Sequence, residues 1–421
     1  MTLSVASKLL ESPRIQQTTV GQICDQFDGE VQTGPFGSQL HASDYSEEGT
    51  PVVMPQDMVE GKISCERIAR VDDGHVRRLS QHQLRTGDIV FSRRGDVTRF
   101  AVVTERESGW LCGTGSIRIR LNCPNVDIGY LRHYLQQEKI GSWLLHHAKG
   151  VTMPNLNTSI IRSIPLTLPP IGEQQRIAAI LDEADAVRRK HEHAVALLTG
   201  LDQAIFADMF GKFCNFPPVH VRRAQPNLPN GWSWVALADV ARLATGHTPD
   251  RKQASYWNGS IPWLSLGDIR SLDGKIAHST AEQVTEEGIE NSSSVLLPKG
   301  TVCFSRTASV GFATIMGQPM CTSQDFVNWV CGPRIDPVFL LGALIAARRE
   351  LLSLASGSTH RTIYFPTAEK FQVLLPPIET QKRFAAMAGR VAIEYEKMKR
   401  RSPPLGTLFS SLQHRAFSGQ L

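Results

Sequence analysis

An internal duplication constrains the fold of this chain more than any other feature. The residues Leu-Pro-Pro-Ile at 168–171 recur at 375–378, an offset of 207 residues (375 − 168). The same offset places Gln174 on Gln381. Solenoid repeats have periods of roughly 20–50 residues, so a period of this length excludes a solenoid. The sequence therefore predicts two tandem copies of one large unit.

Each copy is predicted to be a variable globular domain followed by a shared long helix. The segment GDIVFSR at 87–93 matches GTVCFSR at 300–306. Short β-branched and aromatic runs around both segments predict strands. Apolar helical patterns at 128–145 and 337–354 close each globular part. The predicted fold class is α+β, with two mixed α/β domains separated by two long helices. The predicted boundaries are 1–167 and 213–374 for the two domains, and 168–212 and 375–421 for the two helices.

The segments that follow the Leu-Pro-Pro motif are predicted to be long helices with an apolar seam. Residues 173–210 contain no proline and only one glycine, Gly200. About 38 helical residues would span ~57 Å, too long to be covered by the helix's own domain. Mostly apolar residues recur at alternating spacings of four and three in both copies, the heptad pattern of a coiled coil. The proposed seam consists of Ile177, Leu181, Ala184, Val195, Leu198, Ile205, Phe384, Val391, Tyr395, Met398, Leu405 and Leu412.

We expect the two seams to bury each other in an antiparallel pair. The alternative is that each helix packs on its own domain. Pro403-Pro404 removes two helical hydrogen-bond donors, so a break or kink is expected in the second helix. An antiparallel pair would place two similar domains at opposite ends of a rigid spacer. A pseudo-two-fold axis would then relate the two copies within one chain.

Composition and charge are those of an ordinary soluble globular protein. Of the 421 residues, 41% are hydrophobic and 20% are charged. The longest apolar stretch, 338–347, is too short for a membrane span, which needs roughly 20 residues. The eight cysteines form no CxxC pair and the N-terminus lacks the apolar core of a signal peptide. We therefore expect a cytoplasmic protein whose net charge of +5 permits a polyanionic partner.

No sequence motif for catalysis is present. There is neither a GxGxxG nor a GxxxxGK[ST] phosphate loop. The two Pro-Pro pairs after Leu168 and Leu375 lack the preceding Asn or Asp with which an amino-methyltransferase would hold a flipped base. His191 and His193 are two positions apart on a predicted helix and so point apart, which argues against a metal site. The sequence predicts no catalytic residue, no metal and no cofactor.

A two-ended spacer suits a ligand with two separated sites at a fixed distance, and duplex DNA is the common ligand of that kind. Lys and Arg bind its phosphates, while Arg reads guanine and Asn or Gln reads adenine. The turn at 93–96, Arg-Arg-Gly-Asp, is the strongest candidate in the first domain. The proposed DNA-binding residues are Ser38, Gln39, Gln56, Arg93, Arg94 and Arg99 in the first domain, and Thr248, Arg251, Lys252, Arg306, His360 and Arg361 in the second.

This layout resembles the specificity subunit of type I restriction–modification systems. The motifs that carry the resemblance are LPPIGEQQRIAAILDEAD with LPPIETQKRFAAMA, GDIVFSRRGD with GTVCFSRTASVG, and GSIPWLSLGDI. The resemblance implies a non-catalytic subunit in which two target recognition domains alternate with two conserved helices. It further implies a bipartite DNA target, two methyltransferase subunits as partners and, in a full complex, two restriction subunits. Thr380 stands where the first copy has Glu173, so the motifs are not identical.

Two other classes of function stay open at this point. A stand-alone DNA-modifying enzyme would transfer a methyl group from S-adenosylmethionine, or cleave DNA, as the purified chain alone. A two-headed structural or glycan-binding protein would show no affinity for nucleic acid at low salt. Strongly salt-dependent DNA binding would favour the recognition subunit over that last class.

Overall fold

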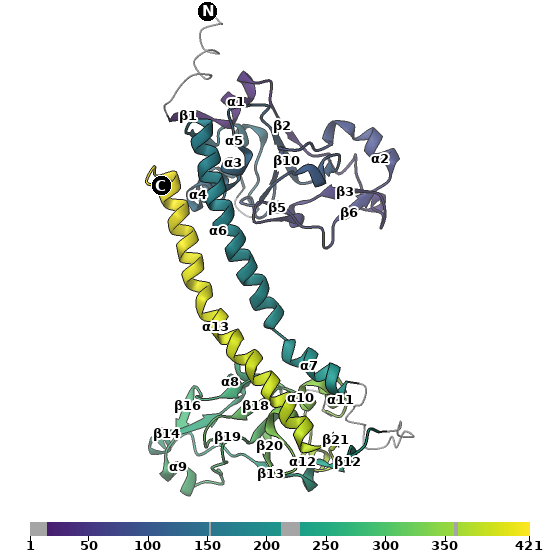
Figure 1. The fold of residues 1–421 in the computed structure, drawn as a ribbon, viewed down its shortest axis with the longest axis vertical. Helices are drawn as coiled ribbons and strands as arrows, with labels where there is room; N and C mark the ends of the chain where they lie inside the picture. The colour runs from purple at the N-terminus through teal and green to yellow at the C-terminus, as the bar shows by residue number, and fades with distance from the viewer. Residues whose placement is uncertain (1–14, 151–152, 212–227, 358–360) are drawn as a thin grey trace, which may run out of the picture. The chain divides into compact units, whose positions relative to one another are not determined.

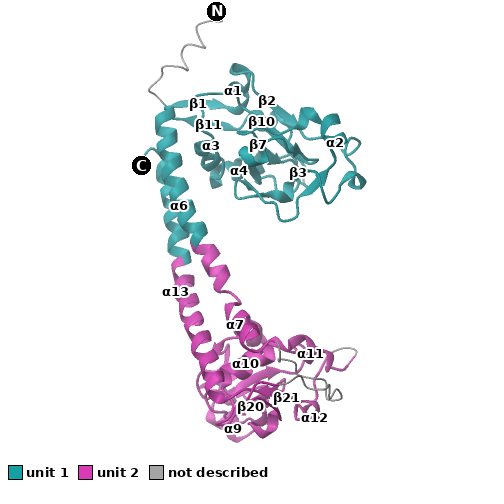
Figure 2. Cartoon of the chain, turned by 45° about the vertical axis from the view of Figure 1, so that its right-hand side comes forward, with its two compact units in different colours: residues 1–190, 402–421 teal, residues 191–401 magenta. Residues whose placement is uncertain are grey.

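The computed structural model divides the chain into two compact units (Figures 1 and 2). Unit 1 comprises Met1–Lys190 and Ser402–Leu421, and unit 2 comprises His191–Arg401. We call the strand-bearing part of each unit its head, residues 15–168 in unit 1 and 228–375 in unit 2. The structure describes residues 15–150, 153–211, 228–357 and 361–421.

Unit 1 contains a head of strands and short helices and parts of two long helices. Its strands are β1 (Gln16–Thr19), β2 (Glu30–Thr33), β3 (Thr50–Val53), β4 (Met58–Val59), β5 (Lys62–Ile63), β6 (Ala69–Val71), β7 (Ile89–Ser92), β8 (Phe100–Val102), β9 (Leu111–Cys112), β10 (Ser116–Arg120) and β11 (Pro165–Leu168). The helices of the head are α1 (Val20–Gln26), α2 (Asp73–Arg78), α3 (Ile128–Leu135), α4 (Glu138–His147) and α5 (Thr158–Arg162). The long helices are α6 (Ile171–Leu198) and α13 (Ile378–Phe417).

An antiparallel sheet of order β2-β10-β7-β8 forms the centre of the head of unit 1. Because side chains alternate along a strand, Phe91 and Ile117 face a core shared with α1, α3, α4, α5 and α6. Val90 faces the other way, into a second core with Val53 of the three-stranded sheet β6-β3-β9. The central sheet is therefore covered on both faces.

Unit 2 repeats this plan with different elements. Its strands are β12 (Ser233–Ala236), β13 (Ala241–Thr245), β14 (Trp257–Leu264), β15 (Ile276–Ala277), β16 (Glu282–Val284), β17 (Val302–Ser305), β18 (Ala313–Met316), β19 (Cys321–Thr322), β20 (Phe326–Cys331) and β21 (Gln372–Leu375). Its helices besides the long ones are α7 (Leu201–Phe210), α8 (Leu266–Leu272), α9 (Glu286–Glu290), α10 (Pro337–Ala346), α11 (Arg348–Ser353) and α12 (Phe365–Ala368).

The internal repeat predicted from the sequence is confirmed. The central sheet of unit 2 has the order β13-β20-β17-β18-β15, and its first four strands correspond to β2-β10-β7-β8 of unit 1. Phe91 pairs with Ile117 in the first sheet, and Phe304 pairs with Val327 in the second. The predicted class of mixed α and β structure is also confirmed. The helical segments 128–145 and 337–354 each form two helices, because the chain turns once between α3 and α4 and once between α10 and α11.

A buried glutamine explains the recurrence of the Leu-Pro-Pro motif. The Gln174 side chain accepts a hydrogen bond from the backbone N–H of Asp127 (2.9 Å) and donates to the carbonyls of Asn125 (3.0 Å) and Pro169 (2.7 Å). Gln381 makes the equivalent three bonds in unit 2, to Asp336, Arg334 and Pro376. Each glutamine therefore fastens the start of a long helix to the loop before α3 or α10.

The sequence predicts one continuous helix of about 38 residues after the first Leu-Pro-Pro motif, but the structure has two helices there. The helix α6 stops at Leu198, and α7 begins at Leu201. Gly200, between them, has φ +82°, a left-handed conformation that glycine adopts without steric cost. The hydroxyl of Thr199 donates to the Val195 carbonyl (3.0 Å) and occupies an acceptor at the helix end. The single glycine of this segment therefore marks a break.

Of the break or kink expected at Pro403-Pro404, the break is wrong. The helix α13 runs from Ile378 to Phe417 with both prolines inside it. Both proline rings are exposed. Proline has no backbone N–H, so the carbonyls of Lys399 and Arg400, four residues earlier, receive no helical hydrogen bond. Lys399 and Arg400 are exposed as well. Those carbonyls lie on the solvent side of the helix, where water can bind them. The Thr407 hydroxyl donates to the Pro403 carbonyl (3.0 Å) within the same segment.

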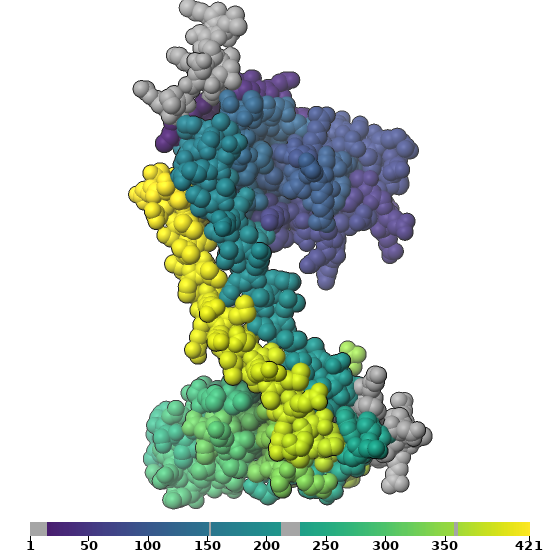
Figure 3. Space-filling view, in the orientation of Figure 1, coloured from purple at the N-terminus to yellow at the C-terminus, as the bar shows by residue number. Residues whose placement is uncertain are grey.

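The helix α13 contacts α6 in unit 1 and α7 in unit 2. In unit 1 the last turns of α13, in yellow, run beside the first turns of α6 (Figure 3). Arg176 donates to the carbonyl of Leu421 (3.0 Å), and the Arg188 guanidinium lies 5.5 Å from the Phe409 ring centre. Position numbers rise on α6 as they fall on α13, so the two segments are antiparallel in unit 1. In unit 2, the ring of Phe206 on α7 lies 5.2 Å from that of Phe384 on α13.

The helices α6, α7 and α13 also bury residues in the heads. Ile177, Leu181 and Ala416 belong to the main core of unit 1. Phe206, Phe210 and Phe384 belong to the main core of unit 2. Packing on a head, considered above as the alternative to pairing, therefore occurs together with pairing. Beyond these ends, the proposed seam residues from Ala184 to Ile205 and from Val391 to Leu412 are half-buried.

The buried imidazole of His133 makes the stability of unit 1 sensitive to acid. Burial lowers the pKa of His133, and its hydrogen bond with Asp182 (2.7 Å) only partly offsets this. The folded state therefore favours the neutral ring. The contribution of the neutral His133 ring to stability is fully present above the pKa of histidine in the unfolded chain, about 6.5. This contribution is lost as the pH falls below that value. We expect the thermal midpoint to fall between pH 7.5 and 5.5, and to fall less in His133→Gln. An equal fall in both proteins would assign the acid sensitivity to other groups.

Candidate nucleic-acid interface

Three loops of unit 1 meet at one end of the central sheet. The segment 34–40 follows β2, the turn 93–99 joins β7 to β8, and the loop 153–157 precedes α5. The backbone N–H of Gly95 donates to the Pro154 carbonyl (3.2 Å), and that of Leu156 donates to the Arg93 carbonyl (2.8 Å). These two backbone bonds tie the turn 93–99 to the loop 153–157, and the Gly34 backbone N–H donates to the carbonyl of Ser116 on β10 (2.9 Å). We call these three loops the first loop surface.

Arg93 stands at the centre of the first loop surface. Its guanidinium carbon lies 6.0 Å from the ring centre of Phe36, which is 58% exposed. The Arg93 Nε is buried and has no hydrogen-bond partner among the residues described. Gly34 approaches Gly113 so closely that a Cβ there would lie 2.0 Å from the Gly113 oxygen. The sequence therefore needs glycine at this position to bring Phe36 to Arg93.

The other proposed residues of the first domain differ in how freely they can reach a ligand. Arg94 and Ser38 are exposed, and within the described part of the chain neither side chain forms a hydrogen bond or ion pair. The Gln39 side chain accepts from the Phe36 backbone N–H (3.1 Å) and fixes the turn that carries Phe36. Arg99 pairs with Asp96 (3.0 Å); hydrogen bonds from Thr98 and Arg99 lower the pKa of this carboxyl. Gln56 is exposed, and its neighbour Pro55 lies close to Gly115. The carbonyl of Gly115 accepts a hydrogen bond from the Arg93 backbone N–H (2.7 Å).

The corresponding end of the sheet in unit 2 also gathers three loops. Arg306 follows β17, and its Nε donates to the carbonyl of Gln324 (3.0 Å). The Thr248 hydroxyl donates to the side-chain oxygen of Gln324 (2.5 Å). The backbone N–H of Ile363 donates to the Arg306 carbonyl (2.9 Å), as Leu156 does to Arg93 in unit 1. We call the loops at 246–252, 306–311 and 361–363 the second loop surface.

Arg251 and Lys252 lie on the second loop surface under different constraints. Arg251 forms two bonds with Glu282, and its guanidinium lies 4.0 Å and 4.9 Å from the ring centres of Trp257 and Trp263. Its donors are therefore largely used within the head. Lys252 is exposed. Arg361 is an exposed residue of the second loop surface, and His360 lies outside the described residues.

Sequence reasoning missed several residues of these surfaces. Gln324 joins Thr248 to Arg306, yet it follows β19 in a segment without any recognisable motif. Met153 is 59% exposed. By the offset of 207 residues, it occupies the position in the first copy that His360 occupies in the second. That offset, applied loop by loop, would have added the loop 153–157 to the candidates of the first domain.

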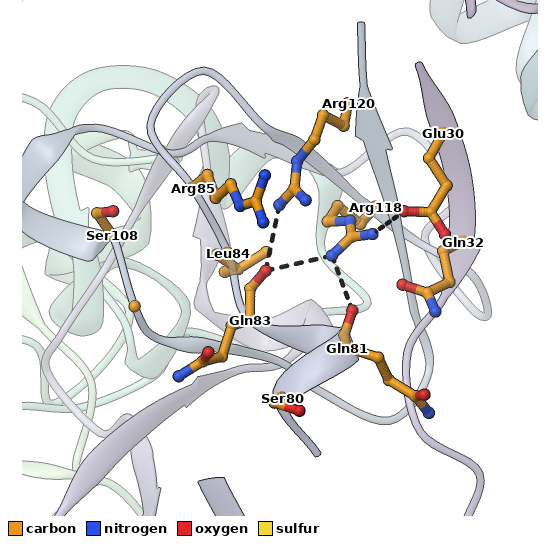
Figure 4. A pocket seen from close by; sticks show the side chains of 11 residues that line it. Glu30, Gln32, Ser80, Gln81, Gln83, Leu84, Arg85, Ser108, Arg118 and Arg120 are labelled. Atoms are coloured by element: carbon orange, nitrogen blue, oxygen red, sulfur yellow. Dashed lines mark hydrogen bonds and ion pairs between the residues drawn. The ribbon is translucent and has the colours of Figure 1, made fainter. Parts of the chain in front are cut away.

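A polar pocket of about 430 Å³ is lined by side chains of β2, of β10 and of the segment 80–85 (Figure 4). Arg118 donates to the carbonyls of Gln81 (3.0 Å) and Gln83 (3.2 Å) and pairs with Glu30. Arg120 forms two bonds with the buried Asp88. These two arginines are thus matched by acids within the head, and they fasten the segment 80–85 to the central sheet.

Among the residues that the structure describes, no group of three or more His, Cys, Asp or Glu would hold a metal ion. In the same part of the chain, no helix has both the length and the apolar character needed to cross a bilayer.

Two repeated heads, each with loops gathered at one sheet end, define a duplicated protein of mixed α and β structure. Residues 39–195 and 229–392 match the family described as "Type I restriction modification DNA specificity domain". The chain belongs to this family of type I restriction–modification specificity proteins. Specificity subunits of these systems are non-catalytic DNA-recognition subunits that act with methyltransferase subunits.

Similar proteins support the same assignment. The chain is 20% identical over 348 residues to the putative type I restriction enzyme MjaX specificity subunit of Methanocaldococcus jannaschii, covering 80% of this chain and 79% of that one. It is 25% identical over 162 residues to the MjaIX specificity subunit of the same organism, which covers 38% of each chain. The solved type I restriction–modification S subunit from M. genitalium shares the fold, with a TM-score of 0.57 at 14% identity over 96% of each chain.

Proposed function

We propose that each head reads one half of an interrupted DNA target. The observation that carries this proposal is that the two loop surfaces share a backbone plan but not their side chains. Arg93 and Arg306 occupy equivalent places after β7 and β17, and each carbonyl accepts from the loop before α5 or α12. Around them, Phe36 and Arg94 in unit 1 have no counterpart of the same type in unit 2. One scaffold with two sets of side chains suits two different half-sites.

The second part of the proposal concerns the long helices. We propose that α6 and α7 together pair with α13 as an antiparallel coiled coil that fixes the distance between the half-sites. The antiparallel segments within unit 1 and the aromatic contacts within unit 2 support this arrangement. The proposed division into recognition domains (1–167 and 213–374) and helices (168–212 and 375–421) is retained, with the first helix interrupted at Gly200.

We further propose that the helix pair docks two methyltransferase subunits on near-equivalent surfaces, because an antiparallel pair presents similar faces at its two ends. In a full complex, two restriction subunits would join them. Catalysis would reside in these partners, and this chain would supply the choice of target.

Methylome sequencing of the host, with this gene intact and deleted, tests the proposal. We expect deletion to abolish one adenine-methylated motif made of two specific parts separated by unspecified bases. Reintroducing the intact gene should restore the same motif. Loss of an uninterrupted motif, or of none, would contradict the proposal.

A further inference from the structure

The hairpin of β4 and β5 in unit 1 has a strained turn whose tip faces a long helix. Glu60 and Gly61 connect the two strands with φ values of +48° and +75°. A residue other than glycine rarely adopts such a value, and it persists where the surroundings hold it. The carbonyl of Gly61 accepts from Val102 (3.1 Å), which ties the turn to β8 of the central sheet. The tip is thus a rigid extension of the head.

Glu60 binds the long helix α6 through two arginines. Its carboxylate lies 3.0 Å from Arg188 Nη2 and 3.2 Å from Arg189 Nη2, and its carbonyl accepts from Arg189 (3.2 Å). The buried carboxylate of Asp185 holds both arginines from the helix side, at 2.8 Å and 2.7 Å. Burial alone would raise the pKa of Asp185, but the two guanidinium groups outweigh it and lower that pKa. The two arginines are therefore held between Asp185 on the helix and Glu60 on the head.

The contacts around this cluster connect three elements of unit 1. The Gln136 side chain, just after α3, donates to the Glu60 carbonyl (2.8 Å). Asp182 of α6 binds His133 of α3 and also pairs with Arg132. The His133 carbonyl accepts from Gln413 of α13 (3.1 Å). The head is thus fastened to both long helices at the level of Glu60.

The second copy does not repeat this cluster. At the offset of 207 residues, Ala392, Tyr395 and Glu396 stand where α6 has Asp185, Arg188 and Arg189. Asp273, which precedes Gly274 in the equivalent turn of unit 2, pairs with Arg348 of α11 (2.7 Å). An acid at the tip of the turn therefore binds the spacer helix in unit 1 and a helix of its own head in unit 2.

We propose that Glu60 is a positioning residue that fixes the orientation of the first head on α6, and thereby sets how strictly the complex selects the spacer between the half-sites. This inference rests on the proposed function. One added base pair moves a half-site by about 3.4 Å and turns it by about 34°. A head held at two levels of the helix resists that rotation, whereas a head held only at its base would follow it.

Glu60→Gln tests this inference in the complex reconstituted with the methyltransferase subunits. Methyl transfer is measured on duplexes that carry the wild-type target with its native spacer, or with one base pair more or fewer. We expect the preference for the native spacer to fall about fivefold or more, as for the loss of one coupling between neighbours. The base preferences within each half-site should not change. Glu47→Gln, which removes an exposed acid from the same head, serves as the matched control.

A double variant separates the contact from a general loss of folding. Glu60→Gln with Arg189→Gln should relax the spacer preference no further than Glu60→Gln alone, because Glu60→Gln already removes the carboxylate that Arg188 and Arg189 share. Thermal unfolding of each variant sets the assay temperature below its melting range. An unchanged spacer preference, one that falls equally in Glu47→Gln, or relaxed base preferences would overturn the inference. If the wild-type complex methylates no two-part target, the proposed function itself fails, and this inference fails with it.

Discussion

Replacing Arg93 and Arg94 with alanine is expected to relax recognition of one DNA half-site and leave the other intact. Arg93 lies beside Phe36 on the first loop surface, and Arg94 is exposed next to it. An arginine that reads a base edge contributes about 1–3 kcal/mol of discrimination. We therefore expect discrimination in one half-site to fall by at least about tenfold. Methyl transfer by the reconstituted complex, on duplexes with single substitutions along both half-sites, measures this.

The control for this experiment removes the same charge elsewhere on the same head. Arg67 and Arg77 are exposed, and Arg67→Ala with Arg77→Ala leaves the first loop surface intact. We expect this control to change base preference in neither half-site. A loss that is equal in both half-sites of the Arg93 and Arg94 variant would mean that these arginines serve only general affinity for phosphates. The assignment of one head to one half-site would then be wrong.

Phe206→Ala is expected to destabilise unit 2 by about 3–5 kcal/mol, the usual cost of emptying a buried phenylalanine site. The Phe206 ring is fully buried, with ring centres at 4.8 Å (Phe210), 5.2 Å (Phe384) and 5.8 Å (Phe339). It lies against Gly342, where a Cβ would stand 2.6 Å from the ring. The cavity therefore borders α7, α10 and α13 together. Denaturant unfolding measures the change in free energy.

A matched apolar truncation on the surface shows what this burial contributes. Ile393 lies on α13 in the same unit and is 62% exposed. Ile393→Ala should change the free energy of unfolding by no more than about 0.5 kcal/mol. If Phe206→Ala were as stable as Ile393→Ala, the packing of α7 against α13 would contribute little to unit 2.

The sequence was informative where two copies could be compared. The duplication, the strands around 87–93 and 300–306, and the positions of both long helices followed from repeated residues with a physical reason, such as Gln174 and Gln381. The position of the helix break did not follow. A proline inside a helix costs about 3 kcal/mol and a glycine about 1 kcal/mol. Yet Gly200 interrupts the first helix, whereas Pro403 and Pro404 lie on the exposed side of an unbroken one.

The candidate site was only partly predictable because its residues come together through tertiary contacts. Arg93 and Arg94 were identified from a turn between two strand patterns, which is local information. The pairing of Arg251 with Glu282, or of Thr248 with Gln324, depends on loops that are 31 and 76 positions apart. The hydrophobic periodicity of helices and strands is local and does not predict contacts between residues so far apart in the sequence. The sequence alone does not distinguish a free arginine from one that is already bound within the head.

Exchange of one recognition domain tests most directly whether the chain reads two half-sites with two heads. Residues 213–374 would be replaced by the corresponding segment of another family member, and the methylome of the host would be sequenced. We predict that the new motif keeps one part of the original target, changes the other part and retains the spacer. A motif altered in both parts would contradict the proposed division of recognition between the heads, as would one altered in neither.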